Sequence, residues 1–195
     1  GMDNADRIMC VSELTRQTVI NQYHQDPKKV FTVHNAVYPL KPEVAAMPRP
    51  DHRGKEKIVT FLGRITMQKG PEYFVEAASL VLHRTSGIRF CMAGSGDMMN
   101  QMIYLAAERG ISDRFHFPGF MRGNQVYECL KDSDVYVMPS VSEPFGISPL
   151  EAMQCGTPSI ISYQSGCAEI LTNCIKVDYW DTQALADAIY SICNN

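Results

Sequence analysis

The chain has 195 residues, of which 45% are hydrophobic and 20% are charged, and this length supports one domain with a sizeable core. Eighteen Lys and Arg residues stand against 21 Asp and Glu. The resulting net charge of −3 gives no support to a nucleic-acid partner, which usually needs a basic excess. No apolar run approaches the roughly 18–20 residues of a membrane-spanning helix, so we expect no membrane span.

Cysteine and histidine spacing bear on the compartment and on metals. The seven cysteines are odd in number and contain no Cys-x-x-Cys pair, which indicates reduced thiols in a reducing compartment. The first residues lack the basic and apolar regions of a signal peptide. We therefore expect a cytoplasmic location, with a membrane-peripheral one left open for a full-length protein. We expect no metal site, because metal-ligand spacing of His or Cys is absent.

Strand and helix patterns alternate along the chain. Apolar, β-branched runs predict strands at residues 7–11, 30–34, 57–62, 88–93, 114–117, 134–138 and 158–161. Helical patterns cover residues 12–23, 71–82, 97–109, 147–154 and 181–193, with Ser12 and Asp181 as candidate N-caps. Several strands are apolar on consecutive residues, which is typical of strands covered on both faces. The alternation predicts an α/β fold with a doubly wound, Rossmann-like parallel sheet.

Composition divides the chain into three parts. Residues 39–55 contain four prolines and a polar cluster, which indicates an exposed connector. We therefore expect residues 1–38 to be an entry segment and residues 56–195 to be the main domain. We also expect the chain to be a piece of a longer protein.

A loop with two cations follows the predicted strand 57–62. Arg64 and Lys69 lie between the glycines Gly63 and Gly70, and two cations five residues apart can converge on one anion. Arginine is suited to forked contacts with phosphate oxygens and lysine to a point contact. The alternative is a solvated loop with two ordinary surface cations.

Two further glycine turns follow strands. Gly94-Ser95-Gly96 resembles the start of a dinucleotide fingerprint, but Met99 takes the third glycine position, so we interpret it as a tight turn. The turn Gly119-Phe120-Met121 is able to line a flat base. A plain turn beside an aromatic core is the equal alternative for that segment.

The segment from Glu143 to Glu151 is the most informative. Gly146 and Ile147 precede a predicted helix, where free backbone N–H groups favour an anion. Two carboxylates flank this position, and carboxylates accept hydrogen bonds from sugar hydroxyls. Paired carboxylates also suit a glycoside hydrolase, but Arg64 and Lys69 favour a phosphate ligand over a neutral glycan. Alternatively, Glu151 is simply a stabilising acid in a first helical turn.

Together these loops resemble the donor-binding, C-terminal half of a GT-B glycosyltransferase of family 4, also called glycosyl transferases group 1. The resemblance covers nearly the whole chain. The residues that carry it are Gly63-Arg64, Lys69-Gly70, Gly94-Ser95-Gly96, Pro118-Gly119-Phe120, Glu143 with Glu151, and Gly156-Thr157-Pro158. Segments 5–12 and 33–37 resemble the family's crossover from its N-terminal domain.

The resemblance implies a retaining, metal-independent transferase without a cofactor, whose donor is a nucleoside diphosphate sugar such as a UDP-, ADP- or GDP-sugar. Arg64, Lys69 and Glu143 would be catalytic, with the two cations on the diphosphate and Glu143 on the donor sugar. Glu151 would bind the ribose. The remaining contacts would come from Gly63, Gly119, Phe120, Met121, Phe145, Gly146 and Ile147, with Gly119 to Met121 beside the base.

The chain departs from the family in one respect. It does not contain the N-terminal acceptor domain, which would be its partner, so we expect it to bind donor but to turn over poorly. A different GT-B enzyme, such as a nucleotide-sugar epimerase or a phosphorylase, and a non-catalytic nucleotide-sugar module are the alternatives. The sugar, base, acceptor and oligomeric state stay open.

Overall fold

A six-stranded, wholly parallel sheet forms the body of the chain in the computed structural model, which describes residues 1–51 and 56–194. This arrangement confirms the predicted doubly wound, Rossmann-like α/β fold. The strands in spatial order are β5 (Phe115–Gly119), β4 (Ile88–Ala93), β3 (Lys57–Leu62), β6 (Val135–Met138), β7 (Ser159–Ser162) and β8 (Ile175–Val177).

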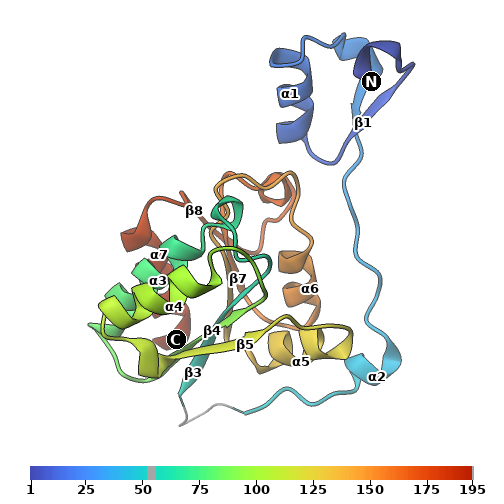
Figure 1. The fold of residues 1–195 in the computed structure, drawn as a ribbon. Helices are drawn as coiled ribbons and strands as arrows, with labels where there is room; N and C mark the ends of the chain where they lie inside the picture. Colours follow the sequence, from blue (N-terminus) through green and yellow to red (C-terminus); the bar gives the residue numbers. More distant parts are fainter. Residues whose placement is uncertain (52–55, 195) are drawn as a thin grey trace.

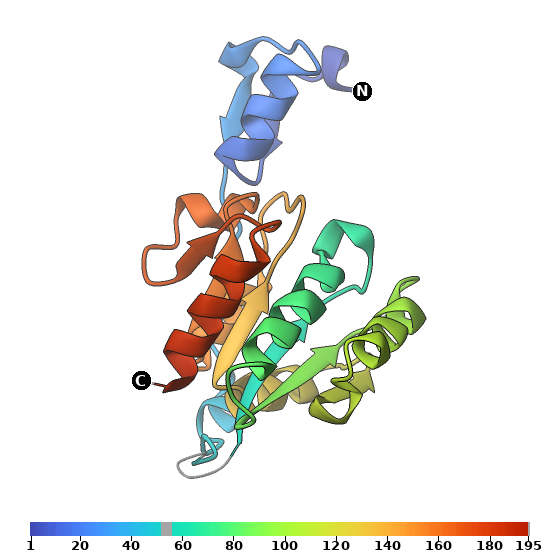
Figure 2. The same cartoon turned by 90° about the vertical axis from the view of Figure 1, so that its left-hand side faces the viewer.

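Helices cover both faces of this sheet (Figure 1). One face carries α3 (Pro71–Leu82), α4 (Met99–Glu108) and α7 (Thr182–Asn194), which lie side by side in Figure 2. The other face carries α5 (Asn124–Asp132) and α6 (Ser148–Gln154). Within the described residues, no helix is both long enough and apolar enough to cross a membrane.

The order of strands reverses between β3 and β6. The chain runs outward from β3 through β4 to β5, and α5 then returns it to the other side of β3. Open α/β sheets bind ligands at such a reversal, beyond the carboxyl ends of the strands. The loops that follow β3 and β6 therefore flank the place where a ligand is expected.

The core explains why these runs form buried strands. All four residues of β6 are buried, as the consecutive apolar pattern predicts. Between the sheet and α3, Phe74 packs edge-on against Phe90, with ring centroids 5.7 Å apart. Burying such aromatic side chains is the main favourable contribution to folding.

The amino-terminal residues form a small separate unit, drawn in blue in Figure 1. Two parallel strands, β1 (Ile8–Cys10) and β2 (Val30–Thr32), pack against α1 (Glu13–Asn21). Ser12 caps α1 as predicted, because its hydroxyl oxygen accepts the Thr15 N–H at 3.0 Å.

Most of the described connector is exposed, as its composition predicts, but it is anchored to the main domain at one point. It contains a short helix, α2 (Pro42–Ala45), whose Val44 is fully buried. The ammonium group of Lys131 on α5 is also buried, and it donates to the carbonyl oxygens of Val44, Ala45 and Met47 at 2.5, 3.2 and 2.7 Å. The last part of the predicted connector, residues 52–55, lies outside the described residues.

Besides short 3-10 turns, two α-helices and one strand of the described residues lie where the sequence analysis assigns no element: α2, α5 and β8. The four-residue helix α2 and the three-residue edge strand β8 are too short to show a period. Helix α5 has nine residues, several of them polar, and it buries Leu130 and Lys131.

We predict that Lys131→Met lowers the free energy of unfolding by about 1–3 kcal/mol, because three carbonyl groups lose a charged donor. Urea titration measures this change. Lys28→Met, at an exposed lysine, is the control and should have no effect. Equal stability of both variants would show that the Lys131 contacts contribute nothing.

Candidate functional site

The loops after β3 and β6 are joined by Gln68, a residue that the sequence analysis does not select. The side-chain amide of Gln68 donates to the Ser142 carbonyl oxygen at 2.9 Å, and the Val141 N–H donates to the Gln68 carbonyl at 3.0 Å. Arg64 in turn donates from Nη2 to Gln68 Oε1 at 3.1 Å. No sequence signal marks Gln68, because its partners lie on a distant loop.

Lys69 and Glu143 form an ion pair across the same two loops. Lys69 ends a 3-10 turn (Met67–Lys69), and both side chains are largely buried, at 19% and 11% exposure. Next to Lys69, Gly70 adopts a φ of +62°, and a Cβ atom there would lie 2.2 Å from the Pro139 carbonyl oxygen. The close approach of the loops therefore requires glycine at this position.

The turn after β4 packs against the loop that carries Arg64 and Lys69. A Cβ atom at Gly94 would lie 1.8 Å from the Gly63 carbonyl oxygen, and one at Gly96 would lie 2.1 Å from that of Ile65. The Ile65 N–H also donates to the Ser95 carbonyl at 2.9 Å. Gly94 and Gly96 are therefore needed for close packing against a neighbouring loop, and this need accounts for the glycine pattern without a bound dinucleotide.

The loop that starts at Glu143 is held by a turn (Gly166–Glu169) that follows β7. The Gly166 N–H donates to the Glu143 carbonyl at 2.9 Å, and the Cys167 N–H donates to that of Phe145 at 2.7 Å. Phe145 is buried, whereas Ile147, which caps α6, is 43% exposed. Gly146 has a φ of +96° and is packed closely by Met138 and Cys167. The backbone of this loop is therefore well fixed.

The amino-terminal unit holds the same loop from the other side. The hydroxyl groups of Ser12 and Thr15 both donate to the Pro144 carbonyl oxygen, at 2.6 and 3.3 Å. The carboxylate of Glu169 accepts the Glu13 N–H at 2.8 Å and is also hydrogen-bonded to His34. The sequence analysis does not select Glu169, because these partners are more than 130 residues apart in the chain.

Glu151 lies in the first turn of α6, half-buried. Burial raises the pKa of its carboxyl group. Within residues 1–51 and 56–194, no donor contacts its carboxylate oxygens. This acid therefore keeps free acceptor positions, which ligand hydroxyl groups can use.

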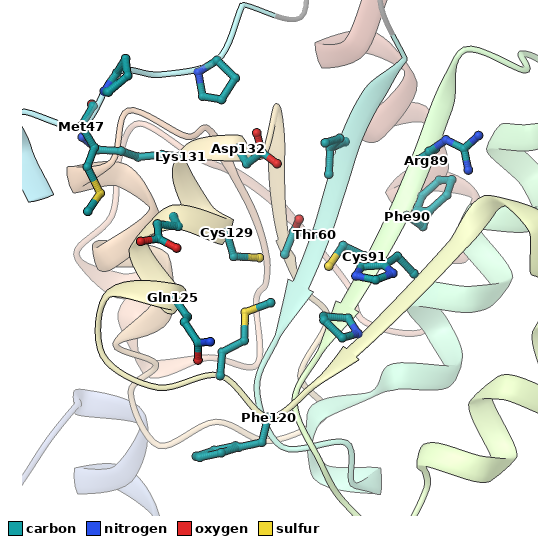
Figure 3. A pocket seen from close by; sticks show the side chains of 17 residues that line it. Met47, Thr60, Arg89, Phe90, Cys91, Phe120, Gln125, Cys129, Lys131 and Asp132 are labelled. Atoms are coloured by element: carbon teal, nitrogen blue, oxygen red, sulfur yellow. The ribbon is translucent and has the colours of Figure 1, made fainter.

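Phe120 and Met121, from the turn predicted to line a base, lie beside a cavity and not beside the charged residues of the predicted site. Phe120 and Met121 line a cavity of about 800 Å³ between the sheet and α5, and Figure 3 shows Phe120 at its rim. Arg64, Lys69, Glu143 and Glu151 do not line this cavity. The structure therefore brings Arg64, Lys69 and Glu143 together and places the turn at Gly119 on their flank, where the Gly94 N–H donates to the Gly119 carbonyl at 2.8 Å.

Metal-binding groups are a separate question. Among the residues that the structure describes, no three His, Cys, Asp or Glu side chains converge as metal ligands do.

Comparison with known proteins identifies the class. The family model of glycosyl transferases group 1 matches residues 45–195. An uncharacterised glycosyltransferase of Methanocaldococcus jannaschii is 33% identical over 85% of this chain, and a D-inositol 3-phosphate glycosyltransferase of Mycolicibacterium smegmatis is 30% identical over 98%. The chain spans only 44% and 46% of these relatives. The chain belongs to the glycosyl transferases group 1 family.

Solved structures place the fold within the GT-B glycosyltransferases. A variant of TarM from S. aureus, in complex with Fondaparinux, alpha-GlcNAc-glycerol and UDP, superposes with a TM-score of 0.85 at 21% identity. The match covers all of this chain and 38% of TarM. The fold is therefore that of one half of a GT-B enzyme, as the sequence predicts.

We predict that Gly94→Ala destabilises the chain far more than Gly110→Ala does. Both glycines have a positive φ, but a Cβ atom at Gly110 meets nothing within 4 Å. Gly110→Ala should cost about 1 kcal/mol through backbone strain alone. Gly94→Ala should cost at least about 2 kcal/mol more, because it forces the Gly63 loop away. Thermal melting compares the two, and equal losses would show that the contact between the loops is unimportant.

Proposed function

We propose that this chain is the donor-binding half of a glycosyltransferase that moves a sugar from a nucleoside diphosphate sugar to an acceptor hydroxyl. A separate acceptor domain is its partner in the complete enzyme, and the chain alone binds donor without efficient turnover. The observation that carries the proposal is the buried pair of Lys69 and Glu143 beside Arg64, at the reversal of strand order. Such a position is where open α/β sheets bind ligands.

The two cations are the groups that hold the diphosphate. The guanidinium of Arg64 is exposed and has donors to spare for phosphate oxygens, since its contact with Gln68 uses one. Lys69 exchanges its partner Glu143 for a phosphate oxygen when the donor arrives. Two fixed charges then stabilise the negative charge that develops on the leaving diphosphate, which is the basis for proposing a metal-independent reaction.

Glu151 and Glu143 bind different parts of the donor. Glu151, with free acceptor positions, takes the ribose hydroxyls, and Glu143, once released from Lys69, accepts from the hydroxyls of the donor sugar. The backbone of Phe145, Gly146 and Ile147 lies beside the sugar and diphosphate. The base lies against the turn from Gly119 to Met121, and the support for this position is the hydrogen bond that links Gly119 to Gly94 beside the cationic loop.

The transfer balances without a further reactant. The bond between the sugar C1 atom and the diphosphate oxygen breaks, and the acceptor oxygen bonds to C1. The nucleoside diphosphate leaves with the electron pair of the broken bond, and the proton of the acceptor hydroxyl is released to water. We propose retention of configuration at C1 because of the family resemblance. We propose a cytoplasmic site of reaction because the seven cysteines are free thiols.

We predict that the chain binds UDP more tightly than UMP by about tenfold to a hundredfold, because only UDP reaches both cations. UDP is the probe because the TarM complex contains it. Isothermal titration calorimetry measures both affinities, with and without EDTA. Arg64→Ala should remove most of the difference, whereas Arg109→Ala, at a salt bridge with Glu76, should keep it. Equal affinity for UDP and UMP, or loss of binding in EDTA, would contradict the assignment.

We predict opposite effects for the two carboxylates. Glu151→Gln should weaken bare UDP about tenfold, because it loses a charged acceptor for the ribose. Glu143→Gln should bind bare UDP at least as tightly as the parent, because Lys69 loses its competing partner. The increase in affinity from UDP to UDP-glucose should be smaller for this variant than for the parent. Unchanged UDP binding by Glu151→Gln would show that Glu151 is not in the site.

The stability of Glu151→Gln provides the control for that titration. Because burial raises the pKa of Glu151, the folded chain holds this proton more tightly than the unfolded chain. The free energy of unfolding therefore falls as pH rises through the raised pKa, and the Gln variant should lack this fall. Melting at pH 5 and pH 7 should show it no less stable than the parent at pH 7, so weaker binding would not reflect unfolding.

A further inference from the structure

Two cysteines line the cavity between the sheet and α5. Cys91 lies on β4, directly opposite Thr60 of β3 in the strand register, and Cys129 lies on α5. Both cysteines line the cavity of about 800 Å³, and Figure 3 shows their sulfur atoms on either side of Thr60. A small reagent that enters the cavity therefore reaches both thiols.

The pair behaves as a proton donor and an acceptor. Hydrogen bonding between the thiols lowers the pKa of Cys129 and raises the pKa of Cys91, so Cys129 gives up its proton more readily than Cys91 does. The Thr60 hydroxyl also stabilises this thiolate, while burial and the Asp132 carboxylate oppose it. The other charged or titratable groups lining the cavity are Arg89, His116, Glu128 and Lys131.

The remaining cysteines are different. Burial raises the pKa of each of them, to about 12 for Cys167 and Cys193, so they stay protonated. They are Cys10, Cys155, Cys167, Cys174 and Cys193. Among the residues that the structure describes, Cys129 is thus the one cysteine whose pKa is lowered, and a lower pKa favours the reactive thiolate.

We propose that Cys91 and Cys129 are an oxidisable pair that a peroxide converts into a disulfide bond between β4 and α5. The Cys129 sulfur attacks the peroxide, the O–O bond breaks, and a sulfenic acid forms as hydroxide leaves. Cys91 then attacks this sulfur, the S–O bond breaks, and water leaves with the thiol proton. The two sulfur atoms are each oxidised by one electron overall, and the peroxide is reduced.

The position of the pair gives the disulfide a structural consequence. In a reducing compartment, disulfides are usually transient and redox-sensing rather than permanent. This disulfide would fix α5 against the sheet directly after the turn from Gly119 to Met121. The proposal does not depend on the sugar-transfer function, because it needs only the two thiols and access to the cavity.

The test treats the reduced, full chain with a small excess of hydrogen peroxide, blocks free thiols with an alkylating reagent and maps tryptic peptides by mass spectrometry. Cleavage at Lys and Arg leaves Cys91 alone in residues 90–109 and Cys129 alone in residues 123–131. We expect these two peptides to be cross-linked, with a mass lower by two hydrogen atoms and five free thiols left of seven. Dithiothreitol should reverse the cross-link.

Variants separate the two roles. In Cys91→Ser, dimedone should trap a sulfenic acid at Cys129, and in Cys129→Ser it should trap none at Cys91. Cys193→Ser is the matched control and should form the cross-link like the parent. Circular dichroism confirms folding, and Cys91→Ala replaces Cys91→Ser if the latter unfolds. Seven free thiols after treatment, or a cross-link that forms within residues 132–176 instead, would overturn the proposal.

Discussion

The ion pair between Lys69 and Glu143 is the interaction on which the site depends. It joins the loops that follow β3 and β6, the two strands at the reversal of strand order. Removing two charges from water is costly, and an internal ion pair is seldom the most stable solution. A buried pair at this place is reasonable if each partner can be exchanged for part of a ligand, a phosphate for Lys69 and a hydroxyl for Glu143. In the structure, each charge satisfies the other.

Backbone contacts between the neighbouring loops, and not side-chain packing alone, hold the Lys69–Glu143 pair in place. Gly94 and Gly96 let the β4 turn approach the cationic loop, and Gln68 ties this loop to Ser142. The amino-terminal unit adds hydroxyl donors to the Pro144 carbonyl, so the loop that starts at Glu143 is held from two directions. A site built this way loses little entropy when a ligand binds, because its backbone is already ordered.

Helix α5 links regions that the sequence places far apart. Lys131 near its end holds the connector through three carbonyl oxygens, and Cys129, two residues earlier, lines the cavity with Cys91 of the sheet. The turn from Gly119 to Met121 leads into the same helix. A change in how α5 packs would therefore shift residues at the connector, in the cavity and beside the proposed position of the base.

The sequence by itself determined the fold class, the family and several elements. The predicted strands 57–62 and 88–93 and the helix 71–82 have the observed bounds, because continuous apolar runs and Pro71 are local signals. The tertiary structure alone decided that Lys69 contacts Glu143, 74 residues away, and that the Glu169 carboxylate accepts a hydrogen bond from the Glu13 N–H at the start of α1. It also decided that Cys91 meets Cys129 across the cavity. Local patterns specify which conformation a segment adopts, whereas contacts between distant segments arise only when the sheet and its crossovers bring them together.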